Sequence, residues 1–332
     1  MNQDIIDAVH QLLKHHCSSA LIQSIEAGGD WRALWHTLES SGFTDALVSE
    51  SMGGAGLATQ EVLGVAICSG QHALPLPWAH TMVARGLLSA HGIVPPTGPL
   101  TTAESAVLVT PTEVCAQVPW GRVADHAILM FQGQAWLVSA NHALITPSGG
   151  PGSLDAQWTW TQWPIADAVQ LPQAAWCEWA AATSAALMAG ALEWSFELSQ
   201  QYANERVQFG KPISKIQVIQ QQLSVMAEHV FAARMAAQIG WHLGFNHHSW
   251  EALAIAKQRT SDAVTVCAPI AHAVHGAMGF TAEYALQLRT RRLHEWRLHF
   301  GSEQHWARQL GARLLLTQGD TLSAAIAVLE PQ

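Results

Sequence analysis

A short run in the second half of the chain places a cation, an amide and a glycine close together. Arg206, Gln208 and Gly210 alternate within residues 202–213. The planar guanidinium of Arg206 suits bidentate, charge-assisted hydrogen bonds to an anionic group, each worth about 1.5 to 3 kcal/mol. An arginine at this point can instead stabilise the C-terminal end of a helix. The residues alone leave both roles open.

A second run of interest, residues 275–283, carries two glycines between two helical patterns. Because glycine has no Cβ, Gly276 lets the backbone approach a bound molecule closely. The earlier glycine segment Met52–Leu57 is interpreted as a simple turn. No strand clearly precedes it, and it lacks the third glycine of the dinucleotide-binding G-x-G-x-x-G pattern.

The composition excludes several classes of protein. Hydrophobic residues make up 49% of the 332 residues and charged residues only 12%, which predicts a folded chain with much buried surface. The formal net charge of −9 argues against nucleic acid as a partner. No apolar run approaches the ~20 residues that span a bilayer, and the N-terminus lacks the features of a signal peptide. We therefore expect a cytoplasmic protein without a membrane partner.

Cysteines and histidines are numerous but do not form recognisable ligand patterns. The five cysteines are scattered, with no C-x-x-C pair, so neither a disulfide framework nor a zinc ribbon is expected. The 18 histidines include no H-E-x-x-H motif, and adjacent pairs such as His247 and His248 would point about 100° apart on a helix. No metal site is predicted, and we expect surface or core histidines instead.

Hydrophobic periodicity divides the chain into three regions. Residues 1–95 alternate helical stretches with turns, and residues 96–172 contain short β-type runs separated by proline and glycine. Residues 173–332 carry long amphipathic patterns joined by short turns, as a helix bundle does. The predicted fold is mainly α, with an N-terminal helical domain, a small antiparallel β domain and a C-terminal four-helix bundle.

The two runs together carry a resemblance to a known family. Residues 202–213 closely resemble the Y-x-x-x-R-x-Q-F-G-x-P-I segment of acyl-CoA dehydrogenases, and residues 275–283 are similar to that family's glycine turn. The resemblance implies the three-region order given above and FAD as cofactor. It also implies that Arg206 reaches the FAD of a neighbouring subunit, with Gln208, Phe209 and Gly276 beside the dinucleotide.

The same resemblance implies that the family's usual catalytic base is missing from this chain. Much of the family carries its catalytic base in an E-G-T-x-Q segment, where this chain has Phe300, and phenylalanine cannot remove a proton. Ser302 and Gln304 match positions that contact the adenosine part of FAD. Another subset places the base near Ala180. Glu178 is a weak candidate there, because two residues turn a helix by about 200°, and Glu303 is offset by a turn.

The flavin-ring motifs of the β domain also lack convincing counterparts. Residues 100–105 resemble a shortened relic of T-E-P-x-A-G-S-D, and Ala273 stands where a FAD-contacting glutamine is usual. Loss of a general base alone typically costs about 10²- to 10⁴-fold in rate. The resemblance therefore implies a chain that does not work alone.

Three hypotheses for the function remain open. The first is a subunit of an acyl-CoA dehydrogenase heteromer, such as a heterotetramer, which completes the FAD site of a homologous catalytic subunit. That complex would act on an acyl-CoA, for example in fatty acid or steroid degradation, and pass electrons to an electron-transfer flavoprotein. The second is a self-sufficient homo-oligomeric flavoenzyme with another base, and the third is a structural subunit without flavin.

Overall fold

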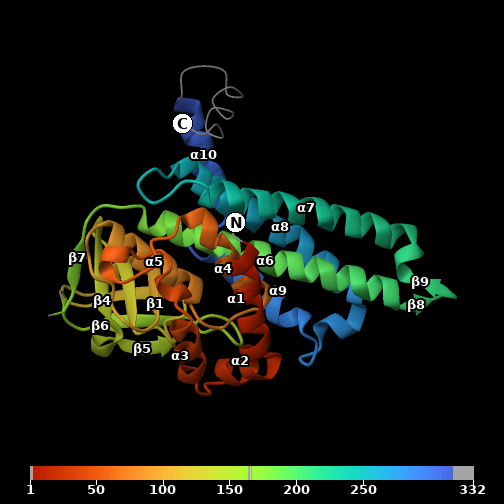
Figure 1. Cartoon of the computed structure of the whole chain (residues 1–332), viewed down its shortest axis with the longest axis horizontal. Coiled ribbons are helices and arrows are strands. Elements are labelled where there is room, and N and C mark those ends of the chain that lie inside the picture. The colour runs from red at the N-terminus through yellow and green to blue at the C-terminus, as the bar shows by residue number, and fades with distance from the viewer. Residues whose placement is uncertain (1–2, 164, 166, 317–332) are drawn as a thin grey trace.

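The computed structural model describes residues 3–163, 165 and 167–316. Its N-terminal region is helical, as predicted, and the Met52–Leu57 segment turns into the fourth helix through Gly53 at φ +88°. Figure 1 shows the order of the elements along the chain. The helices of this region are α1 (Gln3–His16), α2 (Ser19–Glu26), α3 (Arg32–Ser40), α4 (Thr59–Gln71) and α5 (Trp78–Ala90).

Seven strands form one sheet in the order β5-β6-β2-β1-β3-β4-β7. They are β1 (Leu100–Leu108), β2 (Val114–Val118), β3 (His126–Phe131), β4 (Gln134–Ser139), β5 (Leu144–Pro147), β6 (Ala156–Trp160) and β7 (Val169–Leu171).

The sheet is not purely antiparallel, so that part of the prediction was wrong. The first part of β1 pairs with β3 in parallel, and its last residues pair with β2 antiparallel. A register shift between Ala103 and Ser105 lies near the end of the part that pairs with β3, just before the pairing with β2 begins at Ala106. Local sequence could not reveal this, because a long strand can change its partner midway while its side chains keep alternating.

Helices return after the sheet and form the bundle that the periodicity predicted. They are α6 (Trp176–Glu205), α7 (Gln217–Trp241), α8 (Trp250–His275), α9 (Leu286–Leu298) and α10 (Glu303–Leu316). A two-stranded hairpin of β8 (Val207–Gln208) and β9 (Lys211–Pro212) follows α6, and a 3-10 turn, Gly276–Phe280, follows α8. The sequence also predicts a last helical stretch near 303–329. The structure confirms it as far as Leu316, and its remainder lies outside the described residues.

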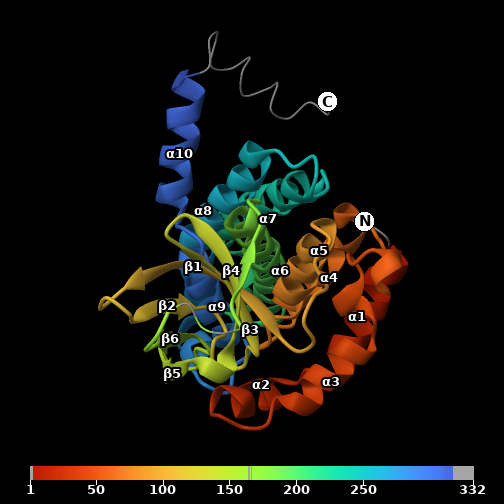
Figure 2. The ribbon, with the colours of Figure 1, turned by 90° about the vertical axis from the view of Figure 1, so that its left-hand side faces the viewer.

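Glycines allow the long helix α6 to pack closely on the N-terminal region. A Cβ built at Gly70 of α4 would lie 1.9 Å from the Leu187 carbonyl oxygen, and one at Gly190 would lie 2.0 Å from that of Ile67. Helix α6 thus touches α4 backbone to backbone and also contacts α5, β1, α7, α8 and α9. Figure 2 shows α6 in the centre, with the N-terminal helices to one side and α10 projecting at the edge.

The hydrophobic core runs through all three regions. One cluster of buried side chains includes Leu13 of α1, Ile128 of β3 and Trp179 of α6. The domain limits predicted at 95/96 and 172/173 fall between secondary-structure elements, since α5 ends at Ala90, the strands span 100–171 and α6 begins at Trp176.

Helix α8 links the two ends of the bundle. Its 26 residues rise by about 1.5 Å each, so its ends lie about 37 Å apart. Trp250 at its start packs on Trp306 of α10, whereas His275 at its end precedes the glycine turn. By length and composition alone, residues 250–280 would be long and apolar enough to cross a membrane. Here α8 packs against α6, α7 and α10, as a core helix of a bundle does.

Candidate functional site

The two sequence runs singled out for binding meet at one end of the bundle. They line a hollow of about 530 Å³. Arg206 and Gln208 come from the end of α6 and the hairpin, and Gly276 comes from the turn after α8. The other lining residues are Tyr202, Ile213 and the segment 273–278. The structure thus brings together three of the six residues predicted to bind a cofactor.

The backbone of Arg206 is fixed while its side chain is exposed. Its N–H donates to the Tyr202 carbonyl at 2.8 Å, and its own carbonyl accepts from the Ile213 N–H at 2.9 Å. Within the described part of the chain, no hydrogen bond or ion pair engages its guanidinium. Arg206 is also the C-cap residue of α6. The helix-end role and the anion-binding role are therefore compatible with one position.

An apolar rim borders this hollow. Phe209, at the tip of the β8–β9 hairpin, is 92% exposed and adopts φ +52°. A left-handed backbone at a non-glycine residue costs of order 1 to 3 kcal/mol and clusters at functional places. Val207, Met278 and Phe280 are exposed as well. We call Val207, Phe209, Met278 and Phe280 the apolar rim. Exposed apolar side chains around a polar hollow are typical of an interaction surface.

The backbone conformation of Gly276, and not a lack of space for a side chain, favours glycine at this position. It adopts φ +61°, where side-chain-bearing residues are strained, and nothing lies within 4 Å of a Cβ built on it. Together with the exposed Arg206 guanidinium, this open backbone fits the pyrophosphate part of a dinucleotide, which needs a cation and close backbone approach.

The position of the family's usual base is buried and apolar. Phe300 is 4% exposed, at φ +58°. Its N–H donates to the Glu104 carboxylate, and its carbonyl accepts from Trp306 Nε1 at 2.9 Å. Its ring stacks on buried His80, with centroids 5.7 Å apart. Phe300 itself thus offers no carboxylate, and the neighbouring Glu104 carboxylate is engaged by the Phe300 N–H.

Ala180 occupies the position where some family members carry their base, and it lies beside Phe300. Ala180 belongs to one small cluster with Phe300 and Trp306. The two alternative base positions therefore converge in space, and both are apolar in this chain. Glu178 lies in the first turn of α6, half-buried and outside this cluster.

Ser302 and Gln304 lie at this same end, not at the hollow. They flank the start of α10, where the Ser302 carbonyl accepts from the Trp306 N–H at 3.2 Å. With α8 separating the two ends by about 37 Å, they cannot share one dinucleotide with Arg206 of the same chain. The predicted cofactor residues thus form two groups, one at each end of the bundle.

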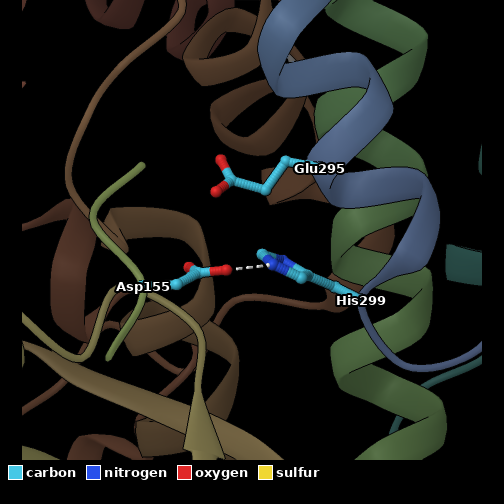
Figure 3. Close-up of side chains that lie close together, drawn as sticks. All are labelled: Asp155, Glu295 and His299. Atoms are coloured by element: carbon cyan, nitrogen blue, oxygen red, sulfur yellow. Dashed lines mark hydrogen bonds and ion pairs between the residues drawn. The ribbon is translucent and has the colours of Figure 1, made fainter. Parts of the chain in front are cut away.

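A cluster of titratable groups, not anticipated from the sequence, lies between the sheet and α9. His299 Nε2 donates to Asp155 Oδ2 at 2.7 Å, with the Glu295 side chain nearby (Figure 3). Glu295 also accepts from the Ser153 hydroxyl. One ligand-type atom from each of Asp155, Glu295 and His299 lies within 4.8 Å of the others. The i, i+4 spacing of Glu295 and His299 on one helix was the only available signal. The expectation of no metal stays a prediction.

Charge rather than burial dominates at His299. Burial alone would lower the pKa of His299, but the Asp155 and Glu295 carboxylates outweigh it and raise that pKa.

Burial lowers the pKa of the Lys257 ammonium to about 7. Lys257 donates to the carbonyls of Trp296 and Arg297 at 2.8 and 2.9 Å. This lysine therefore satisfies the C-terminal carbonyls of α9 just before Phe300.

The surroundings of Phe300 do not fit a flavin dinucleotide. The nearest hollow measures about 260 Å³ and is lined by Glu104, Asp155 and His299, among others. Two carboxylates repel phosphate groups, and among its lining residues no arginine or lysine opposes them. The residues at the Arg206 hollow fit the phosphates of FAD, and those beside Phe300 do not.

Comparisons with known proteins show similarity to acyl-CoA dehydrogenases. The family model "Acyl-CoA dehydrogenase, C-terminal domain" matches residues 174–315. Acyl-CoA dehydrogenase IpdE2 of Mycobacterium tuberculosis is 26% identical over 307 residues, covering 88% of this chain and 90% of that protein. Probable acyl-CoA dehydrogenase YngJ of Bacillus subtilis is 36% identical over 104 residues, which is 31% of this chain and only 27% of that relative.

A solved structure is similar along the whole chain. The ChsE4-ChsE5 complex from Mycobacterium tuberculosis superposes with a TM-score of 0.80 at 20% identity, covering 96% of this chain and 98% of that one. The fold is therefore the acyl-CoA dehydrogenase fold. Residues 174–315 match the C-terminal domain of acyl-CoA dehydrogenases, and the chain is similar to a member of that family over most of its length.

Proposed function

We propose that this chain is a subunit of a FAD-dependent acyl-CoA dehydrogenase heteromer. In this proposal it completes the FAD site of a homologous catalytic chain, which supplies the glutamate base. One observation carries the proposal. The groups suited to bind phosphate, Arg206 and the Gly276 backbone, line an open hollow at one end of the bundle, while buried Phe300 occupies the base position at the other end.

The surface around the hollow supports a partner at this end. Arg206 is anchored by backbone hydrogen bonds but exposed at its guanidinium, and the apolar rim surrounds it. A partner chain would bury the rim and lower the dielectric around Arg206, which strengthens its bonds to phosphate. The hairpin tip at Phe209, strained and 92% exposed, suits a contact made only in the complex.

Within such a complex, this chain's residues would bind and orient rather than react. When bound, FAD accepts the hydride that leaves the β-carbon of the acyl-CoA during α,β-desaturation. Arg206 would hold its pyrophosphate, Gln208 would offer an amide beside it, and Gly276 would let the backbone come close. Phe209 would cover the site from the hairpin. The partner's base would remove the α-proton.

The wider setting follows from this role. We propose a cytoplasmic complex, such as a heterotetramer, that passes its electrons to an electron-transfer flavoprotein. Low charge content, at 12%, fits a chain with a large buried interface. Similarity to a chain of the ChsE4-ChsE5 complex favours a two-chain assembly. A bulky acyl-CoA, as in steroid degradation, is the substrate class that we favour.

The test is to purify the chain alone and together with a full-length acyl-CoA dehydrogenase encoded beside it. We expect a colourless solitary chain and a yellow complex that desaturates acyl-CoA. Flavin and activity in the solitary chain would instead establish a self-sufficient enzyme. A complex that is colourless in every preparation would establish a structural subunit.

A further inference from the structure

We propose that Asp155, Glu295 and His299 form a binding site for one divalent metal ion of the Zn²⁺ type. One ligand-type atom from each residue lies within 4.8 Å of those of the other two. Figure 3 shows the Glu295 side chain reaching from α9 toward the segment that carries Asp155. The inference does not depend on the proposed function. It departs from the expectation of no metal, which rested on local sequence motifs.

The donor set defines the class of ion. Two carboxylates and one imidazole suit Zn²⁺ and its first-row neighbours, whereas Mg²⁺ and Ca²⁺ prefer oxygen ligands throughout. The His299 N–H donates to the Glu295 carbonyl at 3.2 Å, so the two residues stand one helical turn apart at the end of α9. Their side chains can therefore meet one ion, and water fills the remaining coordination positions.

Hydrogen bonds orient both carboxylates toward the cluster. Asp155 Oδ1 accepts from the Trp120 N–H at 2.9 Å, while Oδ2 faces His299. The Ser153 hydroxyl donates to Oε1 of Glu295 and accepts from the Asp155 N–H at 3.1 Å. Within the described part of the chain, Oε2 of Glu295 accepts no hydrogen bond. Outer contacts of this kind fix the direction of metal-ligating side chains.

The cluster needs only a small opening to hold an ion. Bonds of about 2.0 to 2.2 Å place two ligands of a tetrahedral ion about 3.3 to 3.6 Å apart. Asp155 Oδ2 and His299 Nε2 lie 2.7 Å apart. Because Nδ1 of His299 makes no hydrogen bond with any described residue, a small rotation of the ring breaks only the bond that the ion replaces. The Nε2 proton then leaves to solvent.

A hollow of about 440 Å³ gives a hydrated ion access to all three side chains. Its wall also carries Arg291 and Arg292, whose charges oppose a cation. Both arginines pair with Glu26, at 2.8 Å each, so these charges are partly compensated. Within the described part of the chain, no arginine or lysine forms an ion pair with Asp155 or Glu295. The two carboxylates therefore keep their attraction for a cation.

An ion at this place would cross-link two regions of the fold. Asp155 directly precedes β6 of the sheet, and His299 follows α9 of the bundle, 144 residues later in the sequence. The unfolded chain does not hold these ligands together. Metal binding should therefore stabilise the folded state in proportion to its affinity.

The experiment uses the full-length chain without an affinity tag, stripped with EDTA, and takes Zn²⁺ as the probe. Competition with a chromophoric chelator gives the affinity, elemental analysis gives the stoichiometry, and thermal melts give the stability. Asp155→Asn and Glu295→Gln each remove one anionic ligand with little change in shape. The matched control is Asp167→Asn, because Asp167 and His142 form an exposed pair at 3.3 Å that belongs to no group of three ligands among the described residues.

We expect one Zn²⁺ per chain and a rise of about 2 to 5 °C in the melting temperature, with no rise in Mg²⁺. Asp155→Asn and Glu295→Gln should weaken Zn²⁺ binding at least as much as the loss of an outer contact does, about 10- to 100-fold, and Asp167→Asn should not. Melts in EDTA show which variants fold.

A wild-type chain that binds no Zn²⁺ would overturn the proposal. Equal affinity in all folded variants would also overturn it, since the ion would then sit on other histidines. If neither ligand variant folds, anomalous diffraction from Zn²⁺-soaked wild-type crystals decides. A peak between the three side chains supports the site, and peaks only elsewhere reject it.

Discussion

The two ends of the bundle differ in the exposure and hydrogen bonding of their polar side chains. At the hollow, Arg206 is exposed, Nε2 of His275 lacks a partner and apolar side chains face outward. At the Phe300 end, the carboxylates have partners: Glu104 accepts from the Phe300 backbone and Asp155 from His299. Near Phe300, the rings of His80, Trp120 and Phe300 pack on one another. One end is open to a ligand or partner, whereas the other is closed by its own side chains.

Under the proposed function, the chain keeps only the phosphate-binding half of a site that it shares with its partner. The residues for phosphate binding are held by backbone hydrogen bonds that do not depend on the other end, about 37 Å away along α8. The base position could therefore become part of the core without disturbing the hollow.

The largest effect is expected for Phe300→Glu, which returns the family's usual residue to its place. The carboxylate would be buried beside Glu104 and His80, so we expect a loss of about 3 to 5 kcal/mol in the free energy of unfolding and no activity in the solitary chain. Urea denaturation measures the loss. Phe300→Leu, which stays apolar, should cost clearly less. Desaturase activity gained by Phe300→Glu alone would show that this end is a working site.

Arg206→Ala should weaken FAD binding to the complex without changing the stability of the isolated chain. We expect FAD to bind about 10- to 100-fold more weakly to the complex, because a bidentate charge-assisted contact is lost. The melting temperature of the isolated chain should stay nearly constant, since the guanidinium makes no bond within the described part of the chain. Arg308→Ala, an exposed arginine on α10, is the control. Equal effects of the two variants would contradict a specific role for Arg206.

Asp155→Asn should show how the closed end depends on pH. The pKa of His299 is raised in the folded protein above its ordinary 6.5, so the pair with Asp155 contributes fully below that pH. Its contribution is lost as the pH rises through the higher folded-state value. Asp155→Asn keeps an acceptor for the Trp120 N–H and should cost about 1 to 3 kcal/mol at pH 6 and less at pH 9. Thermal melts at both pH values check this, and a larger loss at pH 9 would reverse the assigned charge state.

Phe209→Asn should have the smallest effect on the isolated chain. Asparagine tolerates a positive φ better than phenylalanine, and the wild-type ring is almost fully exposed. The free energy of unfolding should therefore stay within about 1 kcal/mol of the wild type. Association with the catalytic chain, followed by light scattering, should weaken. Unaltered association would remove the apolar rim from the interface.

Much of the fold could be predicted because the helices carry strong periodic patterns. The apolar residues that recur at helical spacing from Ile216 to Val230 fall on α7 and its N-cap, and the chain leaves its helices at Pro212 and Gly276. The partner exchange of β1 could not be predicted, since strand pairing depends on residues distant in sequence.

The candidate site was predictable only where a motif is continuous. Arg206, Gln208 and Gly276 stand in two short runs, and the structure brings them together. The cluster of Asp155, Glu295 and His299 joins two regions about 140 residues apart, which no local pattern could connect. His275 begins the run 275–283, but its unpartnered Nε2 is known only from the structure.

The most direct measurement is an experimental structure of the complex with FAD. The account predicts the Arg206 guanidinium within about 3 Å of the pyrophosphate oxygens of a FAD bound to the partner chain. A FAD seated beside Phe300 of this chain, or an Arg206 side chain remote from every phosphate, would contradict it.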